Sequence, residues 1–316
     1  MPNRKAAIRF LLTSSVMTAI FLFGISLLYS QFGSFAFDDI KCDKSIVSTI
    51  GFICIISGFL FKLGIAPFHS WMIDIYEKSS LFLVIYLNVI WKFFIFFVFA
   101  NTILSIGQIN QQIIHAASIL SMAVGGVMSI FQWNIKRFVA FATVGHMGFL
   151  LSLFSISDHA KILPTAMTYL TTYCFAAICF FVSLIVVKKH NPICRFSDLS
   201  GLIYRCPSAG IGILLSMFAM IGMPPFANFM AKMEIFNLLI NSQNYTMLSA
   251  TIAYSVLCVF YVAKHMRYLF KRSDRQRIDI KNKMVITLQL VLILSFFLYN
   301  GIHNDWNQIL TAGTAP

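Results

Sequence analysis

The stretch FKLGIAPFHSW, residues 61–71, places a lysine and a proline at the end of a long apolar run. A charged side chain inside the hydrocarbon of a membrane costs at least ~2.5–3.5 kcal/mol on insertion scales. Proline removes a backbone donor and interrupts a helix. Lys62 and Pro67 therefore indicate either a helix broken within a membrane or a helix that ends where a loop begins. The charged residues that follow soon afterwards leave the loop interpretation open.

The composition of the whole chain is typical of a membrane protein. Of its 316 residues, 59% are hydrophobic and 11% are charged, and the mean hydropathy is +0.80. A soluble domain has roughly 25% charged residues. Apolar runs of about 20 residues recur, and each is long enough to cross ~30 Å of hydrocarbon. A β-barrel would instead show alternating segments of about 10 residues, so we predict an all-α polytopic membrane protein.

About nine transmembrane helices are expected in a single transmembrane domain, residues 1–316, because no long hydrophilic segment separates them. The basic N-terminal sequence is not followed by a clear cleavage site, so we expect the first helix to be retained. The expected helices are 9–30, 46–65, 80–103, 112–133, 138–156, 163–187, 208–232, 246–266 and 284–302. The connections between them are 31–45, 66–79, 104–111, 134–137, 157–162, 188–207, 233–245 and 267–283.

The basic residues predict an orientation. When alternate connections are assigned to opposite sides, one side receives most of the 24 lysines and arginines. That side holds Arg4, Lys5, Arg9, Lys78, Lys136, Arg137, Lys188, Lys189, Arg195, Arg205, Lys264, Arg267, Lys271, Arg272, Arg275, Arg277, Lys281 and Lys283. The opposite side holds Lys41, Lys44 and Lys161. The positive-inside rule then places the N-terminus on the matrix or cytoplasmic side, where the basic loop 264–283 meets anionic lipid head groups.

Three lysines remain inside the expected helices: Lys62, Lys92 and Lys232. Lys92 lies near the middle of its apolar run, where a lysine normally faces a protein interior or a water-filled path and marks an ion or proton route. Lys62 and Lys232 lie near helix ends, so a snorkelling side chain also fits either one alone.

A second proline site occurs in MIGMPPFANFMAK, where Pro224 and Pro225 precede Lys232. The apolar sequence resumes through Ile240, which favours a kinked or broken helix. Irregular backbone is tolerated in a membrane where it is buried in protein or lines a hydrated cavity. Broken helices in both halves of a membrane protein indicate a transport site.

Other candidates carry a weaker signal. His146 lies within NIKRFVAFATVGHMGFLL and either relays protons, because histidine titrates near neutral pH, or is a structural core residue. Glu234 is either the partner of Lys232 or a surface residue. The seven cysteines form no CxxC pair and no spacing typical of zinc or iron–sulfur ligands. We therefore predict no metal and no redox centre in this chain.

Three motifs, FKLGIAPFHSW, NIKRFVAFATVGHMGF and DLSGL…GMPPFANFMAKMEIF, resemble the antiporter-like subunits of proton-pumping NADH:ubiquinone oxidoreductase, complex I. The form of the first motif is most similar to subunit 2 (the N subunit in bacteria). The resemblance implies two inverted repeats, each with a broken helix. Lys62 and Lys232 would be the lysines of the two broken helices, and Lys92 would belong to a central hydrophilic axis.

His146 and the pair Lys136–Arg137 also fall on motif positions of this family. The resemblance implies that protons pass along these residues, driven by quinone reduction elsewhere. NADH, FMN, iron–sulfur clusters and ubiquinone would be bound by other subunits, so this chain is expected to hold no cofactor.

The resemblance also implies that the chain corresponds to about helices 6 to 14 of the family fold. We therefore expect an N-terminally truncated subunit or the C-terminal piece of a split one. A separate polypeptide would supply the early helices and the glutamate that pairs with Lys62. Other membrane-arm subunits and lipids such as cardiolipin are the expected partners, and nucleic acid is not.

The leading function is thus proton translocation as a subunit of NADH:ubiquinone oxidoreductase. A subunit of a multisubunit cation/proton antiporter and a structural subunit that no longer pumps are the alternatives. The expected location is the mitochondrial inner membrane with the N-terminus in the matrix, and a bacterial plasma membrane is the alternative.

Overall fold

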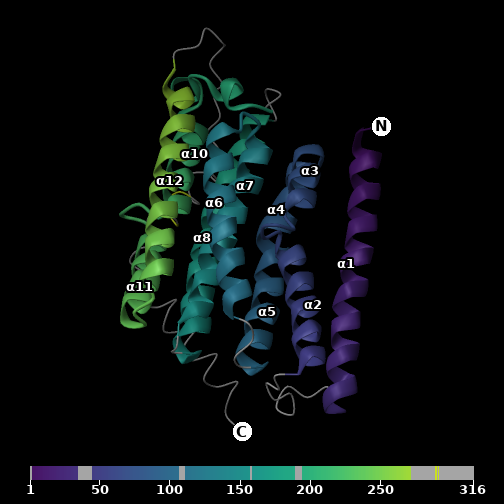
Figure 1. Cartoon of the computed structure of the whole chain (residues 1–316). Helices are drawn as coiled ribbons and strands as arrows, with labels where there is room; N and C mark the ends of the chain where they lie inside the picture. The colour runs from purple at the N-terminus through teal and green to yellow at the C-terminus, as the bar shows by residue number, and fades with distance from the viewer. Residues whose placement is uncertain are drawn as a thin grey trace.

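The computed structural model describes residues 2–34, 45–106, 111–156, 159–188 and 194–271, together with positions 289 and 291. Within these ranges the chain forms a bundle of helices (Figure 1), and the described part contains no strand beyond one isolated bridge between Asn134 and Arg195. The predicted all-α membrane fold is confirmed. The helical elements are α1 (Pro2–Phe32), α2 (Ile46–Leu63), α3 (Ser70–Lys78), α4 (Leu81–Ile85), the π-helix η2 (Tyr86–Trp91), α5 (Lys92–Ile106), α6 (Gln111–Phe131), α7 (Ile135–Leu151), η3 (Ser152–Ser155), α8 (His159–Lys188), η4 (Phe196–Leu199), α9 (Leu202–Arg205), α10 (Pro207–Ile221), α11 (Ala227–Asn241) and α12 (Tyr245–Phe270).

The first eight expected transmembrane segments each correspond to one helix or to a consecutive set of helices, and the ninth, 284–302, lies outside the described residues. Among the described residues, seven segments are long and apolar enough to cross a membrane, and α10 is a shorter apolar helix. Two expected connections need correction. The connection 66–79 contains the helix α3, and α11 extends to Asn241, well into the connection 233–245.

The sequence concealed α3 because it is short and amphipathic. Trp71, Met72, Ile73 and Tyr76 are buried, whereas the charged residues of the same helix are partly exposed. Its charged residues lower the mean hydropathy of the segment, so that by this measure alone it resembles a loop. Their helical spacing, with one face apolar, is the signal of an amphipathic helix.

Both proline sites are breaks between consecutive helices. α2 ends at Gly64 and α10 ends at Gly222, with φ of 70° and 71°. Glycine adopts this left-handed conformation without a steric penalty and commonly terminates helices. A cis peptide bond follows in each break, at Ala66–Pro67 and Pro224–Pro225. The chain then continues as α3 or α11, so Pro67 lies in a broken helix and the loop interpretation is wrong.

The two broken helices run in opposite directions. Figure 1 shows α2 and α3 crossing the bundle from its lower to its upper end, whereas α10 and α11 cross it from top to bottom. Each pair follows a long single helix that packs against it, α1 before α2 and α8 before α10. This is the inverted arrangement of broken helices that the resemblance implied.

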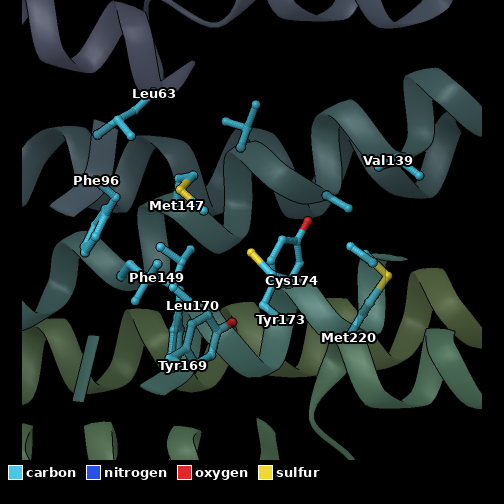
Figure 2. Packing of buried hydrophobic residues seen from close by; sticks show 14 of the residues in the cluster. Leu63, Phe96, Val139, Met147, Phe149, Tyr169, Leu170, Tyr173, Cys174 and Met220 are labelled. Atoms are coloured by element: carbon cyan, nitrogen blue, oxygen red, sulfur yellow. The ribbon is translucent and has the colours of Figure 1, made fainter. Parts of the chain in front are cut away.

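The core is centred on α7. In the segment that contains α7, 94% of the apolar window is buried, compared with 11% for α1. α7 lies very close to α6, because a Cβ added at Gly125 would meet the backbone nitrogen of Gly145 at 2.3 Å. On its other side, α7 packs against α8. The rings of Phe149 on α7 and Tyr169 on α8, both labelled in Figure 2, stack with their centroids 5.3 Å apart.

The helix ends that carry the basic residues lie together at one end of the bundle (Figure 1). Lys136 at the start of α7 donates to the backbone carbonyl of Glu77 at the end of α3, at 3.2 Å. Lys264 near the end of α12 donates to the carbonyl of Ile130 at the end of α6, at 2.8 Å. Within the described ranges this grouping agrees with the orientation analysis. The compartment that this end faces stays a prediction.

Candidate functional site

Lys92 is the first residue of α5 and directly follows the π-helix η2. Its side chain is 1% exposed, and its Nζ atom has no hydrogen-bond partner among the described residues. Single π-helical turns within α-helices are rare and occur frequently at functional sites. Lys92 therefore faces the interior of the bundle, as its central position in an apolar run predicted.

Lys232 lies on α11, and its ammonium group returns to the break that precedes this helix. The side chain is 3% exposed, and Nζ donates to the carbonyl of Ile221, the last residue of α10, at 2.8 Å. The ring centroids of Phe149 and Tyr254 lie 5.3 and 5.9 Å away. A cation is stabilised at the carbonyl end of a helix, so this lysine and this break form one structural unit.

Asn228 completes that unit. Its Nδ2 atom donates to the carbonyls of Ala219 and Met220 at 3.3 and 3.0 Å. The last carbonyls of a helix have no partner within the helix and must find one elsewhere. Asn228 and Lys232 together provide donors for three consecutive carbonyls at the end of α10.

Lys62 is arranged differently. It is half-buried in the last turn of α2, and its Nζ atom lies 5.1 Å from the ring centroid of Phe21 on α1. Within the described residues Lys62 makes no hydrogen bond or ion pair. The first break is instead held by the Trp71 indole, which donates to the carbonyl of Phe61 at 2.9 Å, and by Ser121, which accepts from the N–H of Ala66 at 3.0 Å.

His146 lies on α7 and is fully buried. Its Nδ1 atom is 2.8 Å from the hydroxyl of Tyr169 on α8, and its Nε2 atom is 3.5 Å from the hydroxyl of Tyr261 on α12. It lies within electrostatic range of both Lys92 and Lys232. The fold thus brings together Lys92, His146 and Lys232 from three segments that are far apart in the sequence, whereas Lys62 lies on the side of α1.

Lys136 and Arg137 lie at the start of α7, away from this group. Lys136 donates to the carbonyls of Glu77 and Ser79 and thereby caps the end of α3. Arg137 Nη1 pairs with a carboxylate oxygen of Glu77 at 3.1 Å. Both side chains of this ion pair are partly exposed, so the pair contributes little stability, ~0–1 kcal/mol. Its role is to fix the start of α7 against α3.

Glu234 is not the partner of Lys232. It is half-buried and accepts a hydrogen bond from the hydroxyl of Thr165 at 2.9 Å. Two residues apart on a helix, the side chains of Lys232 and Glu234 point in different directions. The geometry therefore disfavours the ion pair that the sequence left open.

Several neutral polar residues of the site were not found in the sequence analysis. Thr143 Oγ1 lies 2.8 Å from Asn88 Oδ1 and 3.1 Å from the hydroxyl of Tyr173, and Thr172 donates to Asn228 Oδ1 at 3.2 Å. A signal was available: NVIWK and NFMAK each place an asparagine four residues before a buried lysine. Residues four apart share one face of a helix.

The inverted broken helices and the buried lysines agree with what the resemblance to antiporter-like membrane proteins implied. The family model described as NADH:quinone oxidoreductase/Mrp antiporter, transmembrane, matches residues 2–258, and the chain belongs to this family. A relative from Pelagibacter ubique, named NADH-quinone oxidoreductase subunit N, is 28% identical over 310 residues, which cover 94% of this chain and 65% of the relative. The chain spans about 65% of the length of such curated relatives.

Solved structures share the fold. A chain of respiratory complex I from Thermus thermophilus aligns with a TM-score of 0.81 at 21% identity, covering 95% of this chain and 68% of that one. A chain of the Mrp complex from Dietzia sp. aligns with a TM-score of 0.82 at 14% identity, covering 97% and 68%.

Proposed function

We propose that this chain is a proton-translocating membrane-arm subunit of NADH:quinone oxidoreductase, the counterpart of subunit N, or subunit 2. The observation that carries the proposal is the buried group of Lys92, His146 and Lys232, assembled from separate helices inside an apolar bundle. Buried ionisable groups are costly in a membrane protein and normally mark a proton or ion path. The names of the curated relatives support the assignment.

In this proposal a proton moves between Lys92 and Lys232 by way of His146. A neutral lysine amine accepts a proton, and the charged ammonium later releases it to the imidazole. Both nitrogen atoms of the imidazole face tyrosine hydroxyls, Tyr169 at 2.8 Å and Tyr261 at 3.5 Å, so a proton enters and leaves the imidazole by way of these hydroxyls. Quinone reduction elsewhere drives the cycle. NADH, FMN, iron–sulfur clusters and ubiquinone are assigned to other subunits.

The test is the substitution Lys92→Ala in the assembled complex. We expect fewer protons translocated per NADH oxidised, because the path loses its central titratable group, while NADH oxidation continues. Lys188→Ala, which removes an exposed lysine at the end of α8, is the matched control and leaves the ratio unchanged. An unchanged ratio in Lys92→Ala would favour a structural subunit that does not pump.

A subunit of a multisubunit cation/proton antiporter is the second candidate. The TM-scores to the Mrp chain and to the complex I chain are 0.82 and 0.81, and at 14% and 21% identity both concern the fold alone. Purification of the native complex distinguishes the two functions, since only the first predicts associated redox subunits. The relatives compared are bacterial, which favours a bacterial plasma membrane over the mitochondrial inner membrane.

We also propose that a further helix covers the outer side of α1 and provides an acidic partner for Lys62, on the same or on a separate polypeptide. Only 11% of the apolar window of α1 is buried, and Lys62 lies against Phe21 of this helix. A photo-reactive residue at Ser15 in the native complex is expected to cross-link to a membrane helix that carries Asp or Glu. Cross-linking to lipid alone would contradict the proposal.

A further inference from the structure

Asn88 is the meeting point of several buried polar groups that the proposed path does not use. It is fully buried on the π-helix η2. Its Oδ1 atom lies 2.8 Å from the Thr143 hydroxyl on α7 and accepts from the Tyr76 hydroxyl on α3 at 3.5 Å. The carbonyl oxygen of the Asn88 side chain therefore has partners on two neighbouring helices.

The donor side of Asn88 remains open. Nδ2 has no partner among the described residues, and neither does Nζ of Lys92, four positions later. Side chains four apart on a helix are neighbours, with Cβ atoms about 5–6 Å apart. Buried polar groups that lack a protein partner are commonly bridged by an ordered water, which makes about three hydrogen bonds. Two adjacent donors with no acceptor are well suited to one such water.

The second asparagine–lysine pair has a different arrangement. Asn228 lies four residues before Lys232, but its amide donates to two carbonyls at the end of α10 and thus serves the helix break. η2 contains no such break, and the Nδ2 atom of Asn88 donates to no carbonyl within the described residues. Asn228 therefore has a structural role beside Lys232. Asn88, at the same spacing before Lys92, is placed to orient a small polar molecule.

Tyr76, which donates to Asn88, precedes a surface residue in the sequence. It is fully buried, yet the next residue, Glu77, is partly exposed and pairs with Arg137 at the end of the bundle that gathers the basic residues. Lys136 holds the end of α3 in place through two backbone carbonyls. Two consecutive residues of α3 thus reach the interior amide and a surface ion pair.

We propose that protons reach Lys92 from this end of the bundle through Tyr76 and a water molecule oriented by Asn88. The inference rests on the proposed function. Glu77 takes up a proton, and the Tyr76 hydroxyl releases its own proton toward the water as it accepts another from the Glu77 side. The water passes a proton to the neutral Lys92 amine, which becomes an ammonium. Asn88 never changes protonation and is a positioning residue.

The experiment compares Tyr76→Phe and Asn88→Leu with Tyr86→Phe in the assembled complex. Tyr86 belongs to the same π-helix but is 45% exposed, so it is a matched control. We expect both test variants to lower the protons translocated per NADH oxidised, with Asn88→Leu reaching the level of Lys92→Ala. Tyr86→Phe leaves the ratio unchanged. The double variant Asn88→Leu/Lys92→Ala falls no lower than Lys92→Ala, because both changes block one route.

A second readout separates positioning from a structural effect. Asn88→Ser keeps a small hydroxyl donor. If Asn88 orients the transferring water, this variant translocates more protons per NADH oxidised than Asn88→Leu. It also changes the solvent deuterium isotope effect on proton translocation. An isotope effect identical to the wild-type value, together with a full loss in Asn88→Ser, would overturn the positioning role. If the Asn88→Leu variant does not assemble into the complex, the Tyr76→Phe and Asn88→Ser variants test the proposed route.

The outcomes also separate this inference from the proposed function. A loss in Lys92→Ala with normal pumping in Tyr76→Phe and Asn88→Leu would overturn the uptake route and leave the proposed function standing. Normal pumping in Lys92→Ala would overturn the proposed function itself.

Discussion

At the scale of single residues, the second break shows how a membrane helix is interrupted without leaving its polar groups unpaired. Proline and glycine open the backbone at Gly222–Pro225, and the side chains that satisfy the freed carbonyls come from the first turns of the next helix. Lys232 is therefore both a candidate proton carrier and a donor to Ile221. Removal of its charge affects both proton transfer and the stability of the break. A substitution at Asn228 affects the stability of the break alone, so it allows the two effects to be separated.

The substitution Asn228→Leu is expected to destabilise the complex. It removes the side-chain donor to the carbonyl of Met220, and a buried acceptor left without a partner costs ~1–3 kcal/mol. The carbonyl of Ala219 keeps its bond from the N–H of Gly222 at 3.1 Å. Asn237→Leu on the exposed face of the same helix is the control and is expected to have little effect. Thermal unfolding of the two variants in detergent measures the difference. Equal midpoints would mean that the carbonyl of Met220 finds another partner.

At the scale of helices, the close contact of α6 with α7 sets the position of His146. Gly125 faces the backbone of Gly145, the residue before the histidine, and Gly148 faces Ser121, which in turn supports the first break. Small residues allow helix backbones to approach closely in membrane proteins. The histidine, its tyrosine partners and the first break are thus coupled through one helix pair.

Gly125→Ala is expected to force α6 and α7 apart, because its Cβ would meet backbone atoms of Gly145 at 2.3 and 2.5 Å. Overpacking of this kind costs typically ~1–3 kcal/mol. Gly126→Ala is the matched control, since its Cβ would meet the Leu257 side chain at 2.9 Å, and a flexible side chain can move. We expect lower thermal stability and fewer protons per NADH in Gly125→Ala alone. The same loss in Gly126→Ala would contradict this explanation.

The sequence predicted the elements better than their contacts. Prolines, glycines and lysines within apolar runs mark both breaks, because each has a local physical effect on the helix that contains it. α3 was overlooked because its apolar face alternates with charged residues within a short segment. The pairing of His146 with Tyr169 and of Asn88 with Thr143 joins helices across the bundle. No local pattern determines which helices meet, so these partners required the fold.

At the scale of the whole molecule, the two broken helices are inverted but their lysines are not equivalent. Lys232 is enclosed by α7, α10 and α12, whereas Lys62 lies against the largely exposed α1. The second half of the bundle therefore holds a complete buried group together with Lys92. The further helix proposed beside α1 would give Lys62 a comparable environment.

If Lys92, His146 and Lys232 form one path, interruption at any point has the same result. We expect Lys92→Ala, Lys232→Ala and the double variant to translocate the same reduced number of protons per NADH oxidised, because steps in series fail together. Interacting sites give non-additive effects, whereas independent sites add. Lys271→Ala, at the exposed end of α12, is the control for loss of a positive charge. A double variant that pumps distinctly less than either single variant would mean that the two lysines serve separate paths, and His146 would then not connect them.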